Sequence, residues 1–327
     1  MEGNLTRLTS IEFCAGAGGQ ALGLELAGFE HKLLVDNDAD CCATLSANRP
    51  DWRVEQRDMA QYDLPNIGAV DLFAAGLPCP PFSVAGKQLG ENDERNLFPA
   101  ALELIHASQP KFVLIENVRG FLSRSFETYR GQLRDAFSEI GYEVGWKLFD
   151  AKDFGVSQSR SRVAIVAAKS RYWSEYSFPE PCNSAPLAIG DLLVDLMAEN
   201  GWHGARKWQR NARAIAPTIV GGSKKHGGPD LGPTRARSAW EKLGVNGKSI
   251  AETAPPASFD DMPRLTNRMV ARVQGFPDNW RFMGKKTSAY RQVGNAFPPP
   301  VACALGKSIR DCILAVDDPR ASAVAAE

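Results

Sequence analysis

Cys79 has the setting that most suggests chemistry, because it lies between two prolines in the segment GLPCPPFS. The prolines stiffen an extended loop, and this loop follows an apolar run at residues 70–74 that we expect to be a strand. Doubly wound sheets place their reactive groups at the carboxyl ends of strands. A thiolate held at such a place can act as a nucleophile.

A carboxyl group and two arginines occupy similar places further along the chain. Glu116 ends an apolar run at residues 112–115, where its carboxyl group can hydrogen-bond and protonate a ring nitrogen. In GVSQSRSRVAIV, Arg160 and Arg162 alternate as they lead into a strand, so both face the same side. Such a pair can bind an anion or a carbonyl oxygen, although an exposed basic edge has the same pattern.

The segment FCAGAGG predicts a turn that approaches a bound ligand closely. Gly16 and Gly18 allow a tight turn between a strand and a helix whose first N–H groups are unpaired. Asp36 ends the next strand, where a carboxylate can accept from ribose hydroxyl groups. A nicotinamide-dependent enzyme shares this arrangement. The turn departs from GxGxxG, however, and a second carboxylate, Asp58, suits a neutral or cationic cofactor such as S-adenosylmethionine.

The elements that must position these residues alternate along the first half of the chain. Apolar runs predict strands at residues 8–13, 31–35, 70–74, 112–115 and 163–168. Helical patterns predict helices at residues 20–27, 39–48 and 98–108, and near the end of the chain at 301–314. This order predicts an α/β fold with a doubly wound, mostly parallel sheet. From about residue 172 Pro, Gly, Ser, Trp and basic residues become frequent, which predicts a smaller irregular domain of loops and short strands. We expect one domain of residues 1–175 plus 290–327 and another of residues 176–289.

Composition and charge describe a globular protein with one basic region. The 327 residues are 44% hydrophobic, and Lys plus Arg equal Asp plus Glu at 38 each, but residues 181–290 hold 16 basic against 9 acidic residues. This favours contact with a polyanion, although a solvated basic surface is the alternative. No apolar run reaches the ~20 residues of a membrane span, and no secretory signal is visible, so we expect a cytoplasmic protein. The seven cysteines are odd in number and lack CxxC spacing, which argues against a disulfide framework or a metal site.

Taken in order, the motifs resemble those of the DNA cytosine-5 methyltransferase family, in its bacterial restriction–modification form. From Ser10 to about Gly306 the chain carries FCAGAGG, an acidic end to the second strand, PCPPFS, ENV, QSRSR and RQVGNAFPPPVA, an order specific to that family. The resemblance implies a Rossmann-like methyltransferase fold with a target-recognition domain. It also implies S-adenosyl-L-methionine as cofactor and duplex DNA as substrate.

The resemblance further implies a mechanism. The thiolate of Cys79 would add to carbon 6 of a cytosine flipped out of the duplex, which makes carbon 5 nucleophilic. Glu116 would bind ring nitrogen 3 and the amino group, Arg162 the carbonyl oxygen, and Arg160 the loop or the target phosphate.

Nine positions match the cofactor-binding residues of the family: Cys14, Ala15, Gly16, Gly18, Asp36, Asn37, Asp58, Leu97 and Asn295. Three positions depart from its pattern. Cys14 stands where the family often has a phenylalanine packed on the adenine, and Asn37 where it often has a bulky residue, which implies looser adenine packing. Pro80 replaces the commoner glutamine before PFS, which leaves the catalytic atoms in place and alters lid contacts with DNA.

In this family, DNA is read by the smaller domain, which coincides here with the basic region. The pair Thr218-Ile219 resembles the Thr-Leu pair that anchors the recognition loops. We expect DNA contacts from the loop of Cys79 and from this domain, at Ser83, Thr218, Lys224, Lys225 and Arg235. Contact of these side chains with phosphate or solvent is favoured over contact with base edges. A helical pattern returns near residues 262–276. Arg264, Arg268 and Arg272 recur there at a spacing of four, which predicts one helix face. These arginines either bind phosphate or are solvated.

Two other functions share these features. One eukaryotic branch of the family methylates cytosine in tRNA, but its Cys-Phe-Thr signature is absent from this sequence. A catalytically inactive DNA-binding relative is disfavoured because Cys79, Glu116, Arg160 and Arg162 are all retained. We expect a monomer associated with the nucleoid, with a cognate restriction endonuclease acting on the same site.

Overall fold

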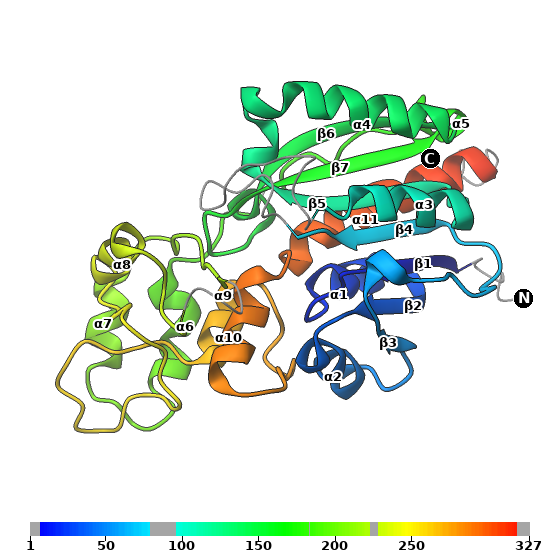
Figure 1. Cartoon of the computed structure of the whole chain (residues 1–327). Coiled ribbons are helices and arrows are strands. Elements are labelled where there is room, and N and C mark those ends of the chain that lie inside the picture. The colour runs from blue at the N-terminus through cyan, green and yellow to red at the C-terminus, as the bar shows by residue number, and fades with distance from the viewer. Residues whose placement is uncertain (1–6, 79–95, 183, 223–227, 319–327) are drawn as a thin grey trace, which may run out of the picture.

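A mainly parallel β-sheet forms the centre of the larger part of the molecule (Figure 1). The structure, a computed structural model, describes residues 7–78, 96–182, 184–222 and 228–318. Within these ranges the sheet has seven strands in the order β3-β2-β1-β4-β5-β7-β6. Their bounds are β1 Leu8–Phe13, β2 Phe29–Asp36, β3 Val54–Gln56, β4 Leu72–Gly76, β5 Phe112–Val118, β6 Tyr142–Asp150 and β7 Ser161–Lys169.

One strand reverses the direction of the sheet. β1 to β5 pair in parallel, whereas β7 runs antiparallel to both β5 and β6. The predicted doubly wound, mostly parallel α/β fold is therefore confirmed. The sequence predicts neither β6 nor the reversal, since Gly145, Trp146 and Lys147 interrupt the apolar alternation in the middle of β6.

Helices cover both faces of the sheet and bury apolar clusters against it. On one face, α3 (Phe98–Ser108) and α4 (Glu127–Glu139) pack on alternate residues of the strands, among them Ile11 and Phe13. On the other lie α1 (Gly19–Leu26), α2 (Ala39–Asn48), α5 (Ser170–Trp173) and α11 (Pro299–Asp317). Short 3-10 helices connect the elements at η1 Met59–Gln61, η3 Arg119–Leu122, η4 Arg124–Phe126 and η5 Ala151–Phe154. No helix in the described ranges is long and apolar enough to cross a membrane.

The first and last helices of the larger part pack together through glycines. A Cβ atom added at Gly23 would lie 2.4 Å from Cβ of Ala302 on α11, and one added at Gly306 would lie 2.7 Å from Cβ of Ala27. Only glycine allows so close an approach of the two helices. The carboxyl-terminal helix therefore completes a layer that the amino-terminal helix begins.

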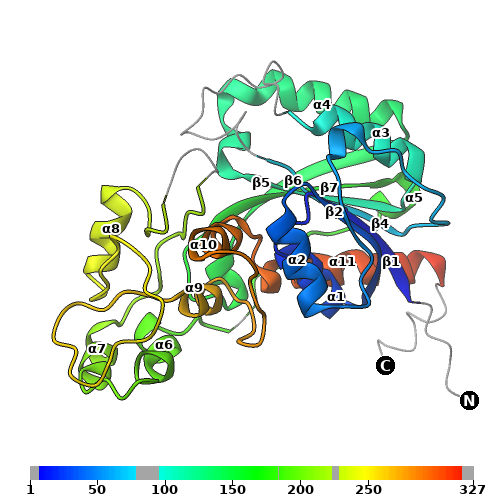
Figure 2. The same ribbon diagram turned by 60° about the horizontal axis from the view of Figure 1, so that its bottom comes forward.

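Helices build the smaller part of the molecule, which lies at the carboxyl edge of the parallel strands (Figure 1). They are α6 Ile189–Met197, α7 Ala205–Asn211, α8 Thr234–Glu241 and α9 Asn267–Val273, and α10 Lys286–Asn295 then connects this part to the larger one. Figure 2 shows α9 and α10 between α2 and the outer helices. The expected loops are present between these short helices, but the expected short strands are not, because in the described part of residues 176–289 β pairing is limited to isolated bridges. Buried Trp208 of α7 and Trp240 of α8 pack in one core with Leu193 and Met197 of α6. The rest of α7 and α8 is too polar for a clear apolar period.

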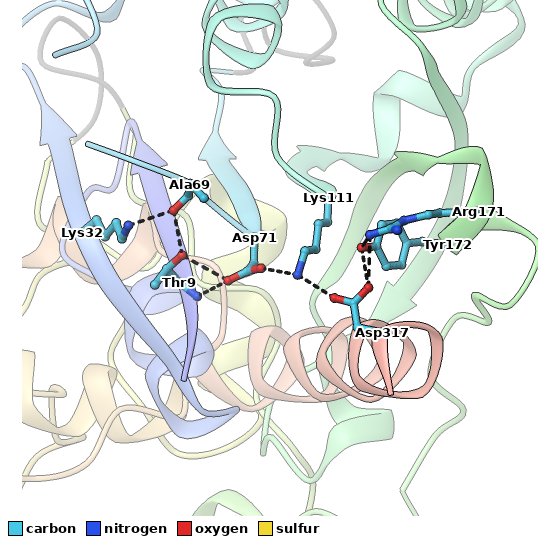
Figure 3. Close-up of polar contacts among 8 residues, drawn as sticks. All are labelled: Thr9, Lys32, Ala69, Asp71, Lys111, Arg171, Tyr172 and Asp317. Carbon is cyan, nitrogen blue, oxygen red and sulfur yellow. Dashed lines mark hydrogen bonds and ion pairs between the residues drawn. The ribbon is translucent and has the colours of Figure 1, made fainter. Parts of the chain in front are cut away.

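A chain of ion pairs closes the opposite, amino edge of the sheet (Figure 3). Nζ of Lys111, just before β5, lies 2.8 Å from Asp71 and 2.7 Å from Asp317 at the end of α11. The backbone N–H of Thr9 donates to Asp71 over 2.7 Å, and the hydroxyl of Tyr172 donates to Asp317 over 2.8 Å. These contacts fix the end of α11 to three strands of the sheet.

Candidate active site

Two neighbouring parallel strands bring the candidate nucleophile and the candidate acid to one edge of the sheet. Gly76, the last residue of β4, pairs in register with Glu116 on β5. Cys79 follows Gly76 by only three residues in the sequence, so the chain leaves the sheet toward the cysteine from a point beside Glu116. Cys79 and Ser83 themselves lie outside the described residues.

The carboxyl group of Glu116 is buried beside an arginine. Glu116 is 7% exposed, and its Oε1 lies 2.7 Å from Nε of Arg162. Because β7 runs antiparallel to β5, Arg162 pairs in register with Val118 and its side chain reaches back to Glu116. Burial raises the pKa of Glu116, while the charges of Arg162 and Arg160 oppose the rise. A carboxyl group in this balance can hold or release a proton next to a bound base.

Arg160 has a different position from its neighbour in the motif. It is 1% exposed, and its guanidinium donates to the carbonyl oxygens of Ile219 at 2.7 Å, Gly294 at 2.8 Å and Ala296 at 3.0 Å. These carbonyls belong to the smaller part of the molecule and to the end of α10. Of the two roles expected for Arg160, these contacts fit the holding of a loop rather than the binding of a phosphate.

The other residues of the motif anchor the segment at 216–219. The side chain of Gln158 accepts from the N–H of Ile219 at 2.9 Å and donates to Gln274 at 2.6 Å. The hydroxyl of Thr218 donates to the carbonyl of Ser159 at 2.6 Å. Thr218, expected among the DNA contacts, thus has its hydroxyl directed at the protein backbone, which fits the anchoring role of the pair it forms with Ile219.

The glycine turn is built against the end of β2. Gly16 and Gly18 have φ of 54° and 84°, and the N–H of Gly16 donates to Oδ2 of Asp36 over 2.8 Å. A Cβ atom on Gly18 would lie 2.7 Å from Leu45, so the backbone approaches α2 closely. Ala15, which directly precedes Gly16, is buried. The turn and Asp36 therefore form one hydrogen-bonded unit at the carboxyl edge of the sheet.

The surroundings of the turn are acidic. Burial is the main cause that raises the pKa of the Cys14 thiol, and the nearby carboxylates of Asp36 and Asp58 raise it further. Sγ of Cys14 points at Sδ of Met59, 3.8 Å away. A neutral, buried thiol beside two carboxylates favours a ligand that is neutral or positively charged.

The remaining candidate cofactor residues come from four separate elements. Asn37 and Asp58 are exposed after β2 and before η1, and Leu97 is half-buried at the start of α3. Asn295 ends α10, where its side chain donates to the carbonyl of Gly222 at 3.2 Å.

Comparison with known proteins decides which of the possible chemistries this arrangement serves. The family described as C-5 cytosine-specific DNA methylase matches residues 8–311. The chain belongs to this family. It is therefore an enzyme that transfers a methyl group from S-adenosyl-L-methionine to carbon 5 of cytosine in DNA, by way of the flipped base and the covalent adduct that are standard for the family.

Individual relatives agree with the family assignment. Type II methyltransferase M.NaeI of Lentzea aerocolonigenes is 51% identical over 93% of this chain and 75% of its own length. Type II methyltransferase M.NgoMIV of Neisseria gonorrhoeae is 49% identical over 93% of this chain and 97% of its own.

Solved structures agree on the fold. A putative DNA modification methyltransferase encoded in a prophage of E. coli has a TM-score of 0.66 at 22% identity, covering 94% of this chain and 99% of its own. DNMT2 of Spodoptera frugiperda has a TM-score of 0.64 at 17% identity, covering 93% and 99%. At these identities the likeness shows the shared fold of this methylase and no more.

Besides Thr218, one residue of this methylase that was expected to contact DNA in the smaller part is described, namely Arg235. It is exposed on α8, whereas Lys224 and Lys225 lie outside the described residues. The three arginines expected on one helix face are not on one helix, since α9 begins at Asn267, after Arg264. Arg268 pairs with Glu199 at 2.9 Å, so it serves contacts within the protein.

Arg272 is likewise used within the methylase. Its guanidinium lies 2.6 Å from Asp195 and also pairs with Asp278. A phosphate would therefore compete with two carboxylates for this arginine, so its position favours the ion pairs within the protein over the phosphate contact.

Two residues near the cofactor turn escape the sequence motifs. Glu12 on β1 and Gln20 on α1 are buried, and Oε2 of Glu12 and both amide atoms of Gln20 have no hydrogen-bond partner among the described residues. A charged residue within the apolar run of β1 was the available signal for Glu12. Orphaned polar atoms beside an acidic turn fit a polar, cationic cofactor such as S-adenosyl-L-methionine.

Proposed function

We propose that this methylase modifies one cytosine within a specific short sequence of duplex DNA, with Cys79 as its nucleophile. The observation that carries the proposal is the pairing of Gly76 with Glu116, together with the ion pair between Glu116 and Arg162. This arrangement puts a proton donor and a cation beside the point where the chain leads to Cys79. Such a set is what addition to carbon 6 of a pyrimidine requires.

The proposed roles follow from the electron flow in the target base. The thiolate of Cys79 forms a bond to carbon 6, and the electrons of the ring shift toward nitrogen 3, which takes the proton of Glu116. Arg162, held by Glu116, stabilises the carbonyl oxygen of the ring. The bound cofactor supplies an electrophilic methyl group. Loss of the proton on carbon 5 to solvent then expels the thiolate of Cys79, and nitrogen 3 returns its proton to Glu116.

We assign a positioning role to Arg160 and Thr218. Their hydrogen bonds to Ile219 and Ser159 connect the smaller part to the strand that carries Arg162. A shift of this segment would move any DNA bound by the smaller part relative to Glu116. Both residues therefore align substrate and catalytic groups rather than react themselves.

The cofactor would be held by the glycine turn and the carboxylates around it. The proposed set comprises Cys14, Ala15, Gly16, Gly18, Asp36, Asn37, Asp58, Leu97 and Asn295, all of which the structure describes. The turn offers backbone groups close to the ligand, and Asp36 and Asp58 supply acceptors for hydroxyl and amino groups.

We further propose a division of labour between residues 1–175 plus 290–327 and residues 176–289. The first part carries the sheet, the turn and Glu116, and the second carries the net positive charge and the exposed Arg235. The second part reads DNA, with phosphates contacted more often than bases. The enzyme acts as a monomer on the nucleoid.

The relatives support a role in restriction and modification. Both M.NaeI and M.NgoMIV are named Type II methyltransferases, and the second matches this chain over 97% of its own length. We infer that a cognate endonuclease cuts the same sequence, and that the methyl mark protects the host DNA from it.

Labelled S-adenosyl-L-methionine, supplied with genomic duplex DNA and in parallel with total tRNA, tests the proposal. We expect label in DNA, and bisulfite sequencing should place it at one recurring motif. Cys79→Ala should lose methylation while binding cofactor and DNA. Cys182→Ala, which changes an exposed cysteine distant in sequence from the motif, is the matched control.

Two outcomes would contradict the proposal. Methylation by Cys79→Ala at the rate of the Cys182→Ala control would exclude Cys79 as the nucleophile. Label in tRNA alone would keep the chemistry and overturn the substrate.

A further inference from the structure

Arg291 on α10 contacts the cofactor end of the site with its side chain and the smaller part with its main chain. Nη2 of Arg291 lies 3.5 Å from Oδ2 of Asp38, two residues after the end of β2. The carbonyl oxygen of Arg291 packs on residues 219–222, since a Cβ atom added at Gly221 would lie only 2.6 Å from it. The contacts of this residue therefore join the cofactor end to the smaller part.

Asp38 is connected to the glycine turn through Asp36. Oδ2 of Asp36 accepts from the N–H of Gly16 at 2.8 Å, and Oδ1 of Asp36 accepts from the N–H of Asp38 at 2.8 Å. The side chain of Asp38 also caps α2, because its Oδ1 accepts from the N–H of Asp40 at 2.9 Å. The carboxylate that faces Arg291 is thus fixed both to the turn and to the beginning of α2.

Buried polar contacts hold α10 beside α2 (Figure 2). The hydroxyl of Thr44 donates to Oε1 of Gln292 over 2.6 Å and accepts from the N–H of Met283 over 2.8 Å. Nε2 of Gln292 donates to the carbonyl of Met283 over 2.8 Å, which closes a ring of hydrogen bonds. Because Thr44 and Gln292 are buried, water competes little with this ring, and the two helices keep one register.

The end of α10 is equally close to residues 219–222. A Cβ atom on Gly294 would lie 2.5 Å from the backbone of Gly221, and the side chain of Asn295 donates to the carbonyl of Gly222 at 3.2 Å. A displacement of α10 would therefore move residues 219–222 relative to the glycine turn.

We propose that Arg291 is a positioning residue that sets the alignment of the methyl donor with the target base. Its ion pair with Asp38 fixes the glycine turn, where the cofactor would bind, relative to the part that would hold DNA. Methyl transfer is sensitive to such alignment, because a displacement of about 1 Å can cost about 10²-fold in rate. This inference rests on the proposed places of cofactor and DNA and adds a residue that acts on their relative position.

Single-turnover methylation with cofactor and DNA both saturating tests this role. Arg291→Gln removes the charge, and we expect its rate to fall about 10- to 100-fold. The dissociation constants of S-adenosylmethionine and of a duplex with the methylated motif should change little. The melting temperature should also change little, because the ring around Thr44 still holds α10 on α2. Arg291→Lys keeps the charge and should recover most of the rate.

A double-mutant cycle separates alignment from a general loss of structure. Asp38→Asn removes the partner charge and keeps the helix cap, since asparagine caps a helix as well as aspartate does. It should lose as much rate as Arg291→Gln, and the double variant should lose no more than either single variant. The control is Lys286→Gln, which removes a charge of α10 whose partner, Glu252 at 2.9 Å, belongs to the smaller part. It should keep the wild-type rate.

The outcomes distinguish this role from the function on which it rests. A wild-type rate in Arg291→Gln, or losses that add in the double variant, would overturn the positioning role. Weaker binding or a lower melting temperature that accounts for the whole loss of rate would overturn it as well. Failure of the wild type to bind S-adenosylmethionine or duplex DNA would instead overturn the proposed function.

Discussion

Glu116 shows two opposing influences on a single carboxyl group. Its ion pair with Arg162 at 2.7 Å favours the carboxylate, whereas its burial favours the protonated acid and is the larger influence on its pKa. The opposition suits a group that must hold a proton until a base arrives and then release it. Arg162 remains beside the carboxylate that results and prevents an uncompensated buried charge.

Replacement of Glu116 by glutamine should slow methyl transfer by about 10²- to 10⁴-fold, because the proton donor to nitrogen 3 is lost. The protonated acid is the active form, so the wild-type rate should fall as the pH rises through the raised pKa of Glu116. The variant should lack this alkaline decline. Single-turnover methylation across the pH range measures both effects.

The control for this substitution is Glu139→Gln, which removes an exposed carboxylate at the end of α4. It should leave both the rate and the pH profile unchanged. A Glu116→Gln enzyme with the rate and profile of that control would exclude Glu116 as the acid.

The positions of site residues in the fold could be predicted from the sequence where a motif lies at a turn or near the end of a strand. Gly16 lies in a turn and Asp36 at a strand end as expected, and Glu116 lies two residues before the end of β5, which is longer than the apolar run predicts. The partners of Arg160 could not be predicted. Ile219 and Gly294 are far from it in sequence, and spacing within a motif carries no information about contacts of that range.

At the scale of elements, the junction between the smaller part and α10 depends on two glycines. A Cβ atom on Gly221 would lie 2.4 Å from Oδ1 of Asn295 and 2.6 Å from the carbonyl of Arg291. One on Gly294 would lie 2.5 Å from the backbone of Gly221. Two backbones in contact fix the position of Asn295, a candidate cofactor residue, relative to the recognition loops.

Gly221→Ala should destabilise the enzyme by about 1–3 kcal/mol, because the added methyl group overpacks this junction. Thermal unfolding measures the loss, and titration with S-adenosylmethionine should show weaker binding as Asn295 is displaced. Gly131→Ala on α4 is the control, since its Cβ would meet no atom within 4 Å. It should be neutral or slightly stabilising; equal behaviour of the two variants would refute the tight junction.

The attachment of α11 should weaken in acid. Burial would raise the pKa of Asp317, but its hydrogen bonds with Lys111 and Tyr172 outweigh burial and lower it. The folded state therefore favours the carboxylate, whose contribution is full above the ordinary aspartate pKa and is lost as the pH falls through the lowered value. Asp317→Asn should reduce the free energy of unfolding by about 1 kcal/mol at neutral pH and by nothing well below about pH 4.

Chemical denaturation at several pH values measures this difference. Asp311→Asn is the control on the same helix, because Asp311 is exposed and pairs only with its neighbour Arg310 among the described residues. A constant difference between wild type and Asp317→Asn at all pH values would contradict the assignment.

Some elements have clear sequence signals and others have none. The helices at 39–48 and 98–108 are found at the expected bounds because a capping aspartate, Asp38, and a proline at the start of α3 mark their beginnings. α8 is polar over most of its surface and buries Trp240 alone, whereas α10 buries the polar residues Ser288 and Gln292 beside Tyr290. Their helicity depends on tertiary packing, which a local pattern does not reveal.

At the scale of the whole molecule, positive charge lies on both sides of the candidate site. Arg235 is exposed on α8, and Arg119 and Arg124 are exposed on the 3-10 helices that follow β5. Arg130 donates to two carbonyls of that connection, which leaves Arg119 and Arg124 to point outward from a fixed backbone. Neither of them forms an ion pair within the described ranges, so a phosphate would be their first ionic partner.

Duplex binding should therefore weaken steeply with salt, and Arg124→Gln should reduce the slope of log affinity against log salt by about one. Fluorescence anisotropy with a duplex that contains the methylated motif measures the slope. Arg7→Gln is the control, because Arg7 lies before β1 at the opposite edge of the sheet and pairs with Glu30. Equal slopes for the two variants would remove Arg124 from the DNA surface.

The packing of α1 against α11 has a consequence for synthesis. Gly23 meets its partner Ala302 only after about 280 further residues have been translated, which takes roughly 15 to 55 s at usual bacterial rates. During that delay α1, α2 and α5 cover only part of one face of the newly made sheet, while α3 and α4 can already protect the other. The nascent chain should therefore recruit a chaperone to the part that α11 later covers, and release should wait for this last helix to emerge from the ribosome.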